Sequence, residues 1–246
     1  MHQFLAIYLP LVIVFFLSST LAGLAGFGAV LLSLPLMAIF LDIKTVIPLT
    51  VLISISTHSI LLLCLWRHLN FKKMWPLLIG TLPGIIPGVW CLKFANKETV
   101  EMILGGTLII YSGWQLISQT DAWTISEKSG YLFGLLAGFL GGAIGASGPP
   151  VIVYTSLVRW NKNVIKTTLH GYFVLSGLLV IACQVTTGFV SPFVLKCYFV
   201  GLPSLILGTF LGSKLYATTG NDSYRKIILG VLMFLGGFII FRSYTA

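Results

Sequence analysis

A serine in a glycine-rich stretch is the first group in this chain that could do chemistry. The stretch runs from Gly138 to Pro150, reads GFLGGAIGASGPP, and lies between apolar runs. Ser147 or Gly148 followed by proline is typical of a helix start, because both residue types cap helices and a proline in the first turn loses no intrahelical donor. A helix that begins there points N–H groups and the positive end of its dipole at whatever lies ahead, which favours an anion.

The same stretch fits the Gly-x-Ser-Gly pattern of an intramembrane serine protease, with Ser147 as nucleophile and His170 as base. Two prolines directly follow the four residues of this pattern, and the copy of the stretch in the first half has no histidine at the corresponding place. We therefore expect a chain that is not an enzyme. The protease stays as an alternative, as does an anion channel, which would need a continuous polar pore.

Two histidines lie inside apolar runs, where ionisable groups are costly and usually functional. His170 shares a helix face with Lys166 and Phe173, and His58 shares one with Ser54. Histidine titrates near neutral pH, so His58 and His170 are candidates for proton coupling. The alternative is that each forms a hydrogen bond to a neighbouring helix, while Lys166 serves as an orienting charge at the membrane surface.

The acidic residues all fall in turns, in a central polar stretch or near helix ends. Sodium coupling usually needs charged oxygen ligands, so proton coupling or uniport fits better. The four cysteines lie in or beside apolar runs without a C-x-x-C spacing, which indicates packing rather than a metal or redox centre. We expect no cofactor and no metal.

The composition is that of a membrane protein. Of 246 residues, 57% are hydrophobic and 9% charged, whereas soluble domains have about 25% charged residues. The net charge of +9 is spread among short loops, as orienting charges are, and does not predict nucleic-acid binding. The N-terminus lacks the basic region of a cleaved signal peptide, so we expect the first apolar run to be retained.

Apolar runs predict seven full spans and three shorter segments beside glycine breaks. The spans are 4–25, 45–66, 74–92, 98–118, 164–185, 191–216 and 224–241, and the shorter segments are 29–41, 131–144 and 150–160.

The chain also contains an internal repeat. The motif L-A-G-x-x-G occurs at 21–26 and again at 136–141, an offset of 115, which places Ser33 and Pro35 on the Ser-Gly-Pro-Pro tetrad. Interrupted segments at corresponding places in two halves are typical of a transporter's binding site.

A second anchor extends the repeat, because the GxxxG pair at 84–88 recurs at 208–212. We predict repeats over 4–118 and 130–242, joined by a polar linker at 119–129. The predicted fold is all-α: a polytopic helical membrane protein with two inverted repeats, each with a broken half-helix pair and three full transmembrane helices.

The distribution of Lys and Arg residues predicts how the chain is oriented in the membrane. If each broken pair returns to its starting side, ten of the 15 basic residues share one side, which the positive-inside rule assigns to the cytoplasm. We expect residues 1–246 to form a single multi-pass domain in the plasma (inner) membrane. The loop at 67–73 would then be cytoplasmic and both termini external.

The predicted substrate is a small organic or inorganic oxyanion, bound where the two half-helix starts converge. The predicted binding residues are Gly26, Gly28, Ser33, Pro35, Gly145, Ser147, Gly148, Pro149, Pro150, Tyr154, Lys166 and His170.

The paired L-A-G-x-x-G openings, the run from Gly145 through Gly-Pro-Pro to Tyr154, and the later Asn163-Val-Ile-Lys-Thr-Thr-Leu resemble the sulfite exporter TauE/SafE family. The resemblance implies a secondary transporter, an exporter of sulfite, sulfonates and related anions. Family members with this run often have Arg-Ala-Thr where this chain has Lys166-Thr-Thr, so a two-pronged oxyanion contact would become a point charge. The expected partners are the anionic substrate, the lipid bilayer and, as an open alternative, a second copy in a homodimer.

Overall fold

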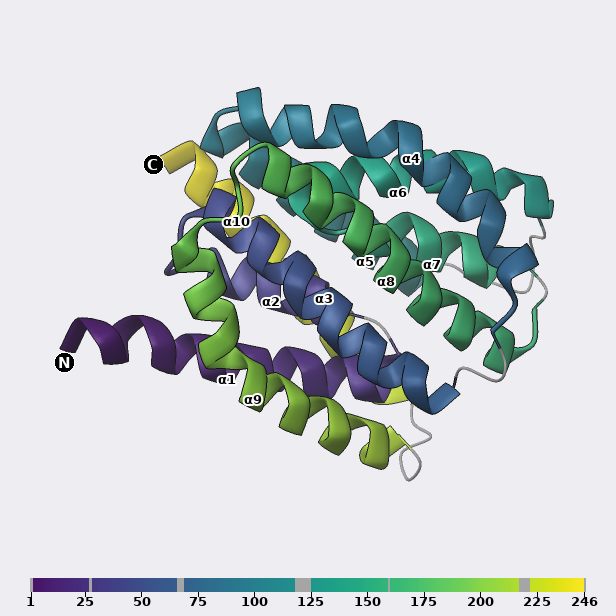
Figure 1. The fold of residues 1–246 in the computed structure, drawn as a ribbon, viewed down its shortest axis with the longest axis horizontal. Helices are drawn as coiled ribbons and strands as arrows, with labels where there is room; N and C mark the ends of the chain where they lie inside the picture. Colours follow the sequence, from purple (N-terminus) through teal and green to yellow (C-terminus); the bar gives the residue numbers. More distant parts are fainter. Residues whose placement is uncertain are drawn as a thin grey trace.

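The computed structural model is helical almost throughout (Figure 1) and describes residues 2–26, 28–65, 69–117, 125–158, 160–216 and 222–245, which contain no strand. The helices are α1 (His2–Ala25), α2 (Ala29–Met37), α3 (Ile43–Leu65), α4 (Phe71–Phe94), α5 (Lys97–Ile117), α6 (Gly130–Ile144), α7 (Gly148–Leu157), α8 (Lys162–Thr186), α9 (Pro192–Tyr216) and α10 (Asp222–Thr245). Each predicted segment corresponds to one helix, which confirms the all-α class. Most of the predicted linker lies outside the described residues, and its end forms a short 3-10 helix, Glu127–Ser129.

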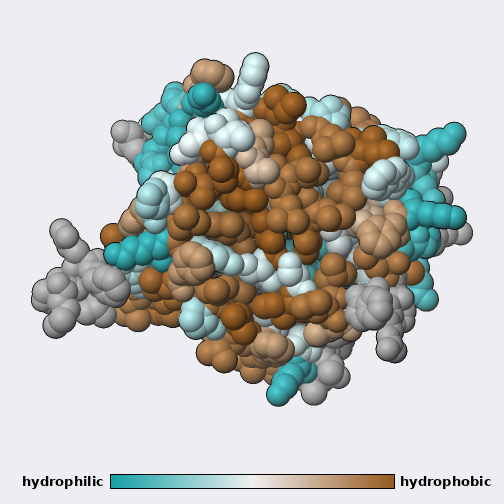
Figure 2. Space-filling view, viewed as in Figure 1, coloured by the Kyte–Doolittle hydropathy of each residue, from teal (hydrophilic) through white to brown (hydrophobic). Residues whose placement is uncertain are grey.

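Six helices in the described part of the chain are long and apolar enough to cross a membrane: α1, α3, α4, α5, α8 and α9. A shorter apolar stretch, Leu229–Tyr244, lies in α10. Figure 2 shows apolar residues over the centre of one face, with hydrophilic residues gathered toward its two ends. This is the distribution that a lipid bilayer requires of a multi-pass protein.

Glycines hold α4 against α6, with the two helices running parallel. A Cβ atom on Gly80, Gly84 or Gly88 would collide with the α6 backbone at Tyr131, Leu135 and Phe139 respectively. The glycines of α6 return the contact, since Gly138 abuts the backbone of Thr81. Small residues at such an interface let two backbones approach closely.

The second half repeats this arrangement between α9 and α1. Gly208 and Gly212 of α9 abut the α1 backbone at Phe16 and Thr20. In Figure 1 α1 and α9 lie side by side along one edge of the bundle, and α4 and α6 lie along the opposite edge. Each GxxxG pair therefore packs its helix closely against the first helix of the other half.

Two further helix pairs run antiparallel. Ile55 of α3 contacts Gly177 of α8, whereas His58, later in α3, meets His170, earlier in α8. α5 and α10 likewise pair in opposite directions, and both termini lie at the same end of the bundle (Figure 1). Inverted repeats require these orientations, because a single crossing per broken pair would make α3 and α8 parallel.

Candidate functional site

The two helix breaks are made by glycines in the left-handed region. Gly26 follows α1 with φ 78°, and Gly145 follows α6 with φ 70°, a conformation that side chains with a Cβ rarely adopt. Gly145 N–H donates to the Gly141 carbonyl at 3.0 Å, and Ala146 N–H donates to that of Leu140 at 3.4 Å. These bonds satisfy the last carbonyls of α6 and turn the chain away.

The breaks correspond at a different offset from the sequence motif. Gly26 and Gly145 lie 119 positions apart, whereas the L-A-G-x-x-G motifs lie 115 apart. The alignment that placed Ser33 and Pro35 on the Ser-Gly-Pro-Pro tetrad is therefore wrong beyond the motif. Both residues are buried inside α2 and are not among those that line the cavity between the breaks.

The starts of α2 and α7 converge on one small cavity of about 20 Å³. With 9 and 10 residues, these helices reach only about 15 Å and cannot cross a core of about 30 Å. The cavity is lined by Gly28, Val30, Leu31, Ser54, His58, Gly145, Ala146, Ser147, Gly148, Ile152 and Phe173. The structure thus brings four of the predicted binding residues together, namely Gly28, Gly145, Ser147 and Gly148.

The start of α2 offers more free backbone N–H groups than the start of α7 does. The first four N–H groups of a helix have no partner within it, and in α2 the first intrahelical bond runs from Leu32 N–H to the Gly28 carbonyl. In α7 the second and third residues are Pro149 and Pro150, which carry no N–H. Most of the backbone donors therefore come from α2, which the sequence argument did not anticipate.

Pro149 and Pro150 face another cavity. They line a separate apolar cavity of about 320 Å³ between α5, α6 and α7, together with Trp114, Phe133 and Leu140 among others. Neither proline is among the residues that line the cavity between the two breaks. Their place in the first turn of α7 fixes where the helix begins.

Ser147 occupies the N-cap position of α7, but its side chain makes no capping hydrogen bond. Its backbone is already helical, with φ −71° and ψ −10°, whereas a capping serine usually has an extended backbone. The predicted side-chain cap is thus absent. The residue instead lines the cavity.

His58 and His170 form a hydrogen bond across the interface of α3 and α8. Their Nδ1 atoms lie 3.0 Å apart, and each residue is 2% exposed. The Phe173 ring lies 4.6 Å from the His58 ring, centroid to centroid. His58 and Phe173 both line the cavity, so the pair links the two halves of the chain directly beside it.

This contact argues against the protease alternative. A nucleophilic serine needs its base within hydrogen-bond reach. In the described part of the chain His170 bonds to His58, and no hydrogen bond joins it to Ser147.

Three other predicted site residues lie apart from the cavity lining. Tyr154, late in α7, donates from its hydroxyl to the Glu127 carbonyl at 3.1 Å and anchors the start of α6. Lys166 lies one turn before His170 on α8, and Gly26 caps α1 at the break. None of the three is among the lining residues, and neither is His170.

Sequence reasoning left out several apolar lining residues, including Val30, Leu31 and Ile152. Ser54 and Phe173 carried a signal, because they share helix faces with His58 and His170. No sequence signal marked Val30 and Leu31, because the motif offset of 115 selected Ser33 and Pro35, about one turn further along α2.

Similarity to known proteins identifies the family of this chain. The family model described as "Sulfite exporter TauE/SafE" matches residues 11–239. A relative from Cupriavidus necator (strain H16), named "Probable sulfite/organosulfonate exporter TauE", is 22% identical over 210 residues, which cover 83% of this chain and 81% of the relative. No solved structure matches the chain. The chain belongs to the sulfite exporter TauE/SafE family.

Proposed function

We propose that this chain is a secondary transporter that exports small sulfur-containing anions, such as sulfite or sulfonates, across the inner membrane. One observation carries the proposal: the starts of two half-helices, α2 and α7, meet at a single cavity between α3 and α8. Helix starts present N–H donors and partial positive charge, which bind oxyanions. The name of the relative and the family supply the sulfur chemistry.

The residues that line the cavity favour an anionic ligand over a neutral or cationic one, whatever its shape. The described lining residues include no acidic side chain, and their polar groups are Ser54, His58, Ser147 and backbone amides. In a medium of low dielectric these donors attract an anion more strongly than they do in water. A cation would meet no opposing charge there.

The present cavity has room for little more than a water molecule. Its volume of about 20 Å³ exceeds only slightly the 10–15 Å³ or so that one water needs. A sulfonate can therefore enter only when the two half-helix starts move apart. This requirement favours a transporter that alternates between conformations over an open channel.

The membrane arrangement belongs to the same proposal. The halves would be inverted repeats, with the start of α4 facing the cytoplasm and both termini outside. Support comes from the antiparallel pairing of α3 with α8 and of α5 with α10, and from the basic residues gathered on one side.

A flux assay tests the function. The purified full chain in liposomes should transport sulfite and ethanesulfonate, and should not transport the uncharged analogue ethyl methyl sulfone. Acetate, which matches the charge but lacks sulfur, measures specificity for sulfur. Equal rates for ethanesulfonate and the sulfone would refute an anion site.

A further inference from the structure

We infer that the His58–His170 pair is a proton-binding site whose occupancy is linked to that of the anion cavity. The inference rests on the proposed function, because it concerns the same site. The Nδ1 atoms of the two rings lie 3.0 Å apart, and each residue is 2% exposed. The pair joins α3 of the first half to α8 of the second, and His58 also lines the cavity.

The geometry fixes how many protons the pair can hold. A hydrogen bond between two Nδ1 atoms needs one that carries a proton and one with a lone pair. When both rings are neutral, the donor ring has an unprotonated Nε2 and the acceptor ring carries its proton on Nε2. One further proton can add to the donor ring without disturbing the bond, whereas a second would occupy the acceptor Nδ1 and break it.

That further proton changes what the cavity offers an anion. His58 uses Nδ1 in the pair, so Nε2 is the ring nitrogen with which it can meet a ligand. As a neutral donor, His58 would turn an unprotonated Nε2 toward the anion and repel it, whereas the protonated ring turns an N–H toward it. As the neutral acceptor, His58 already turns an N–H toward the anion, and the further proton on His170 then adds a positive charge to the pair beside the cavity. The Phe173 ring, 4.6 Å from that of His58, can stabilise a cationic imidazole.

The surrounding charges oppose this proton when the cavity holds no anion. Lys166 lies one turn before His170 and is positively charged, whereas Lys73 at the start of α4 holds its ammonium over the Trp160 ring. Tyr172, hydrogen-bonded to α4 through its hydroxyl, stays neutral at ordinary pH. In the described residues α2, α6 and α7 contribute no acidic or basic side chain to the lining. An anion offsets the repulsion, so proton and anion bind more tightly together than apart.

Calorimetry with ethanesulfonate tests the linkage, because this probe stays a monoanion from acidic to alkaline pH. The purified full chain is titrated in buffers that differ in ionisation enthalpy, at several pH values. We expect proton uptake approaching one per anion at a pH where the pair is otherwise neutral. Over that alkaline limb Kd should rise by about tenfold per pH unit, the slope for one linked proton.

Variants assign the proton to the pair. The double variant His58→Gln/His170→Gln keeps hydrogen-bonding side chains but leaves no titratable group in the pair, and it should bind ethanesulfonate with a Kd that is independent of pH. The control is Ser56→Ala, which removes a hydrogen bond of 2.6 Å from α3 to Tyr198 and should behave as the wild type.

The outcomes separate the two proposals. Binding by the wild type without proton uptake, or uptake that survives in the double glutamine variant, overturns the proton site and leaves the exporter in place. Failure of the folded wild type to bind both ethanesulfonate and sulfite overturns the proposed function, and the linked proton with it.

Discussion

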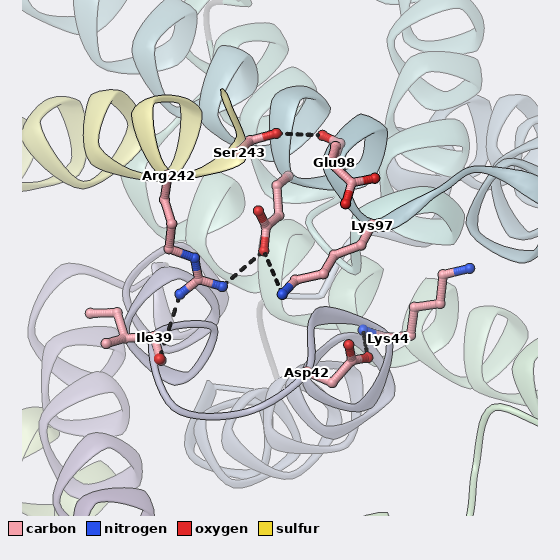
Figure 3. A network of polar contacts seen from close by, with 8 residues as sticks. Ile39, Asp42, Lys44, Lys97, Glu98, Arg242 and Ser243 are labelled. Carbon is pink, nitrogen blue, oxygen red and sulfur yellow. Dashed lines mark hydrogen bonds and ion pairs between the residues drawn. The ribbon is translucent and has the colours of Figure 1, made fainter. Parts of the chain in front are cut away.

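Glu101 of α5 and Arg242 of α10 form an ion pair with 2.9 Å between Oε1 and Nη2, although the glutamate side chain is only 2% exposed. Arg242 also reaches the Ile39 carbonyl just beyond α2, at 3.5 Å, and Ser243 donates to the Glu98 carbonyl at 3.1 Å (Figure 3). These contacts tie the end of α10 to the start of α5 and to the far end of the first half-helix. They lie at the opposite end of α2 from the cavity.

Replacing Arg242 with methionine should destabilise the fold, because it leaves a buried carboxylate without its main partner. Removal of one member of a buried pair costs about 3–5 kcal/mol, and we expect the lower end because Arg242 is 25% exposed. Thermal unfolding in detergent measures the loss. Lys97→Met is the matched control, since Lys97 is 41% exposed and 3.9 Å from Glu101, so its loss should cost less than about 1 kcal/mol. Equal losses in the two variants would contradict this account.

Ser147→Ala should weaken anion binding and leave stability unchanged. The hydroxyl makes no capping bond, so unfolding should shift by less than about 0.5 kcal/mol. If the hydroxyl donates to the anion, its loss costs about 1–2 kcal/mol, or about five- to thirtyfold in Kd for ethanesulfonate. Calorimetry and thermal unfolding on one preparation separate the two effects. A destabilised variant with unchanged affinity would return Ser147 to the role of a cap.

Gly148→Leu should stop transport without unfolding the protein. A Cβ on Gly148 would meet only Ile152 Cδ1 at 3.7 Å and Phe173 Cζ at 3.9 Å, both ordinary contacts, and the rest of a leucine side chain would fill the cavity. We expect ethanesulfonate flux to fall to that of empty liposomes, with Gly148→Ala retaining activity. Gly106→Leu is the control, because nothing lies within 4 Å of a Cβ there. Normal flux through Gly148→Leu would show that the anion passes elsewhere.

Labelling of single cysteines should place Leu69 and Ala95, which flank α4, on opposite sides of the membrane. Leu69→Cys should react from the cytoplasmic side and Ala95→Cys from outside. Cys64 is exposed, so it must first be replaced by serine, and that background serves as the blank. Labelling of Leu69→Cys from outside would invert the proposed topology.

Local sequence patterns are enough to predict the helices and the breaks between them. Apolar runs of membrane-spanning length are local signals, because a backbone in lipid must satisfy its own hydrogen bonds within each helix. The glycines at 26 and 145 are equally local, since positive φ values favour glycine over any other residue. The GxxxG pairs are also visible in the sequence, and Gly84 and Gly208 lie in the close helix contacts that such pairs allow.

Which residues come together at the site depends on contacts between distant parts of the chain. In the first half the break, Gly26, is the last residue of the L-A-G-x-x-G motif, whereas in the second half the break, Gly145, lies four residues after the motif. An alignment on the motif therefore gives Ser33 the wrong partner, while an alignment on backbone conformation pairs Gly26 with Gly145. The contact between His58 and His170 joins residues 112 positions apart. Helix periodicity gives the residues on each face, but which faces of α3 and α8 meet depends on side-chain packing along their whole interface, such as Ile55 against Gly177.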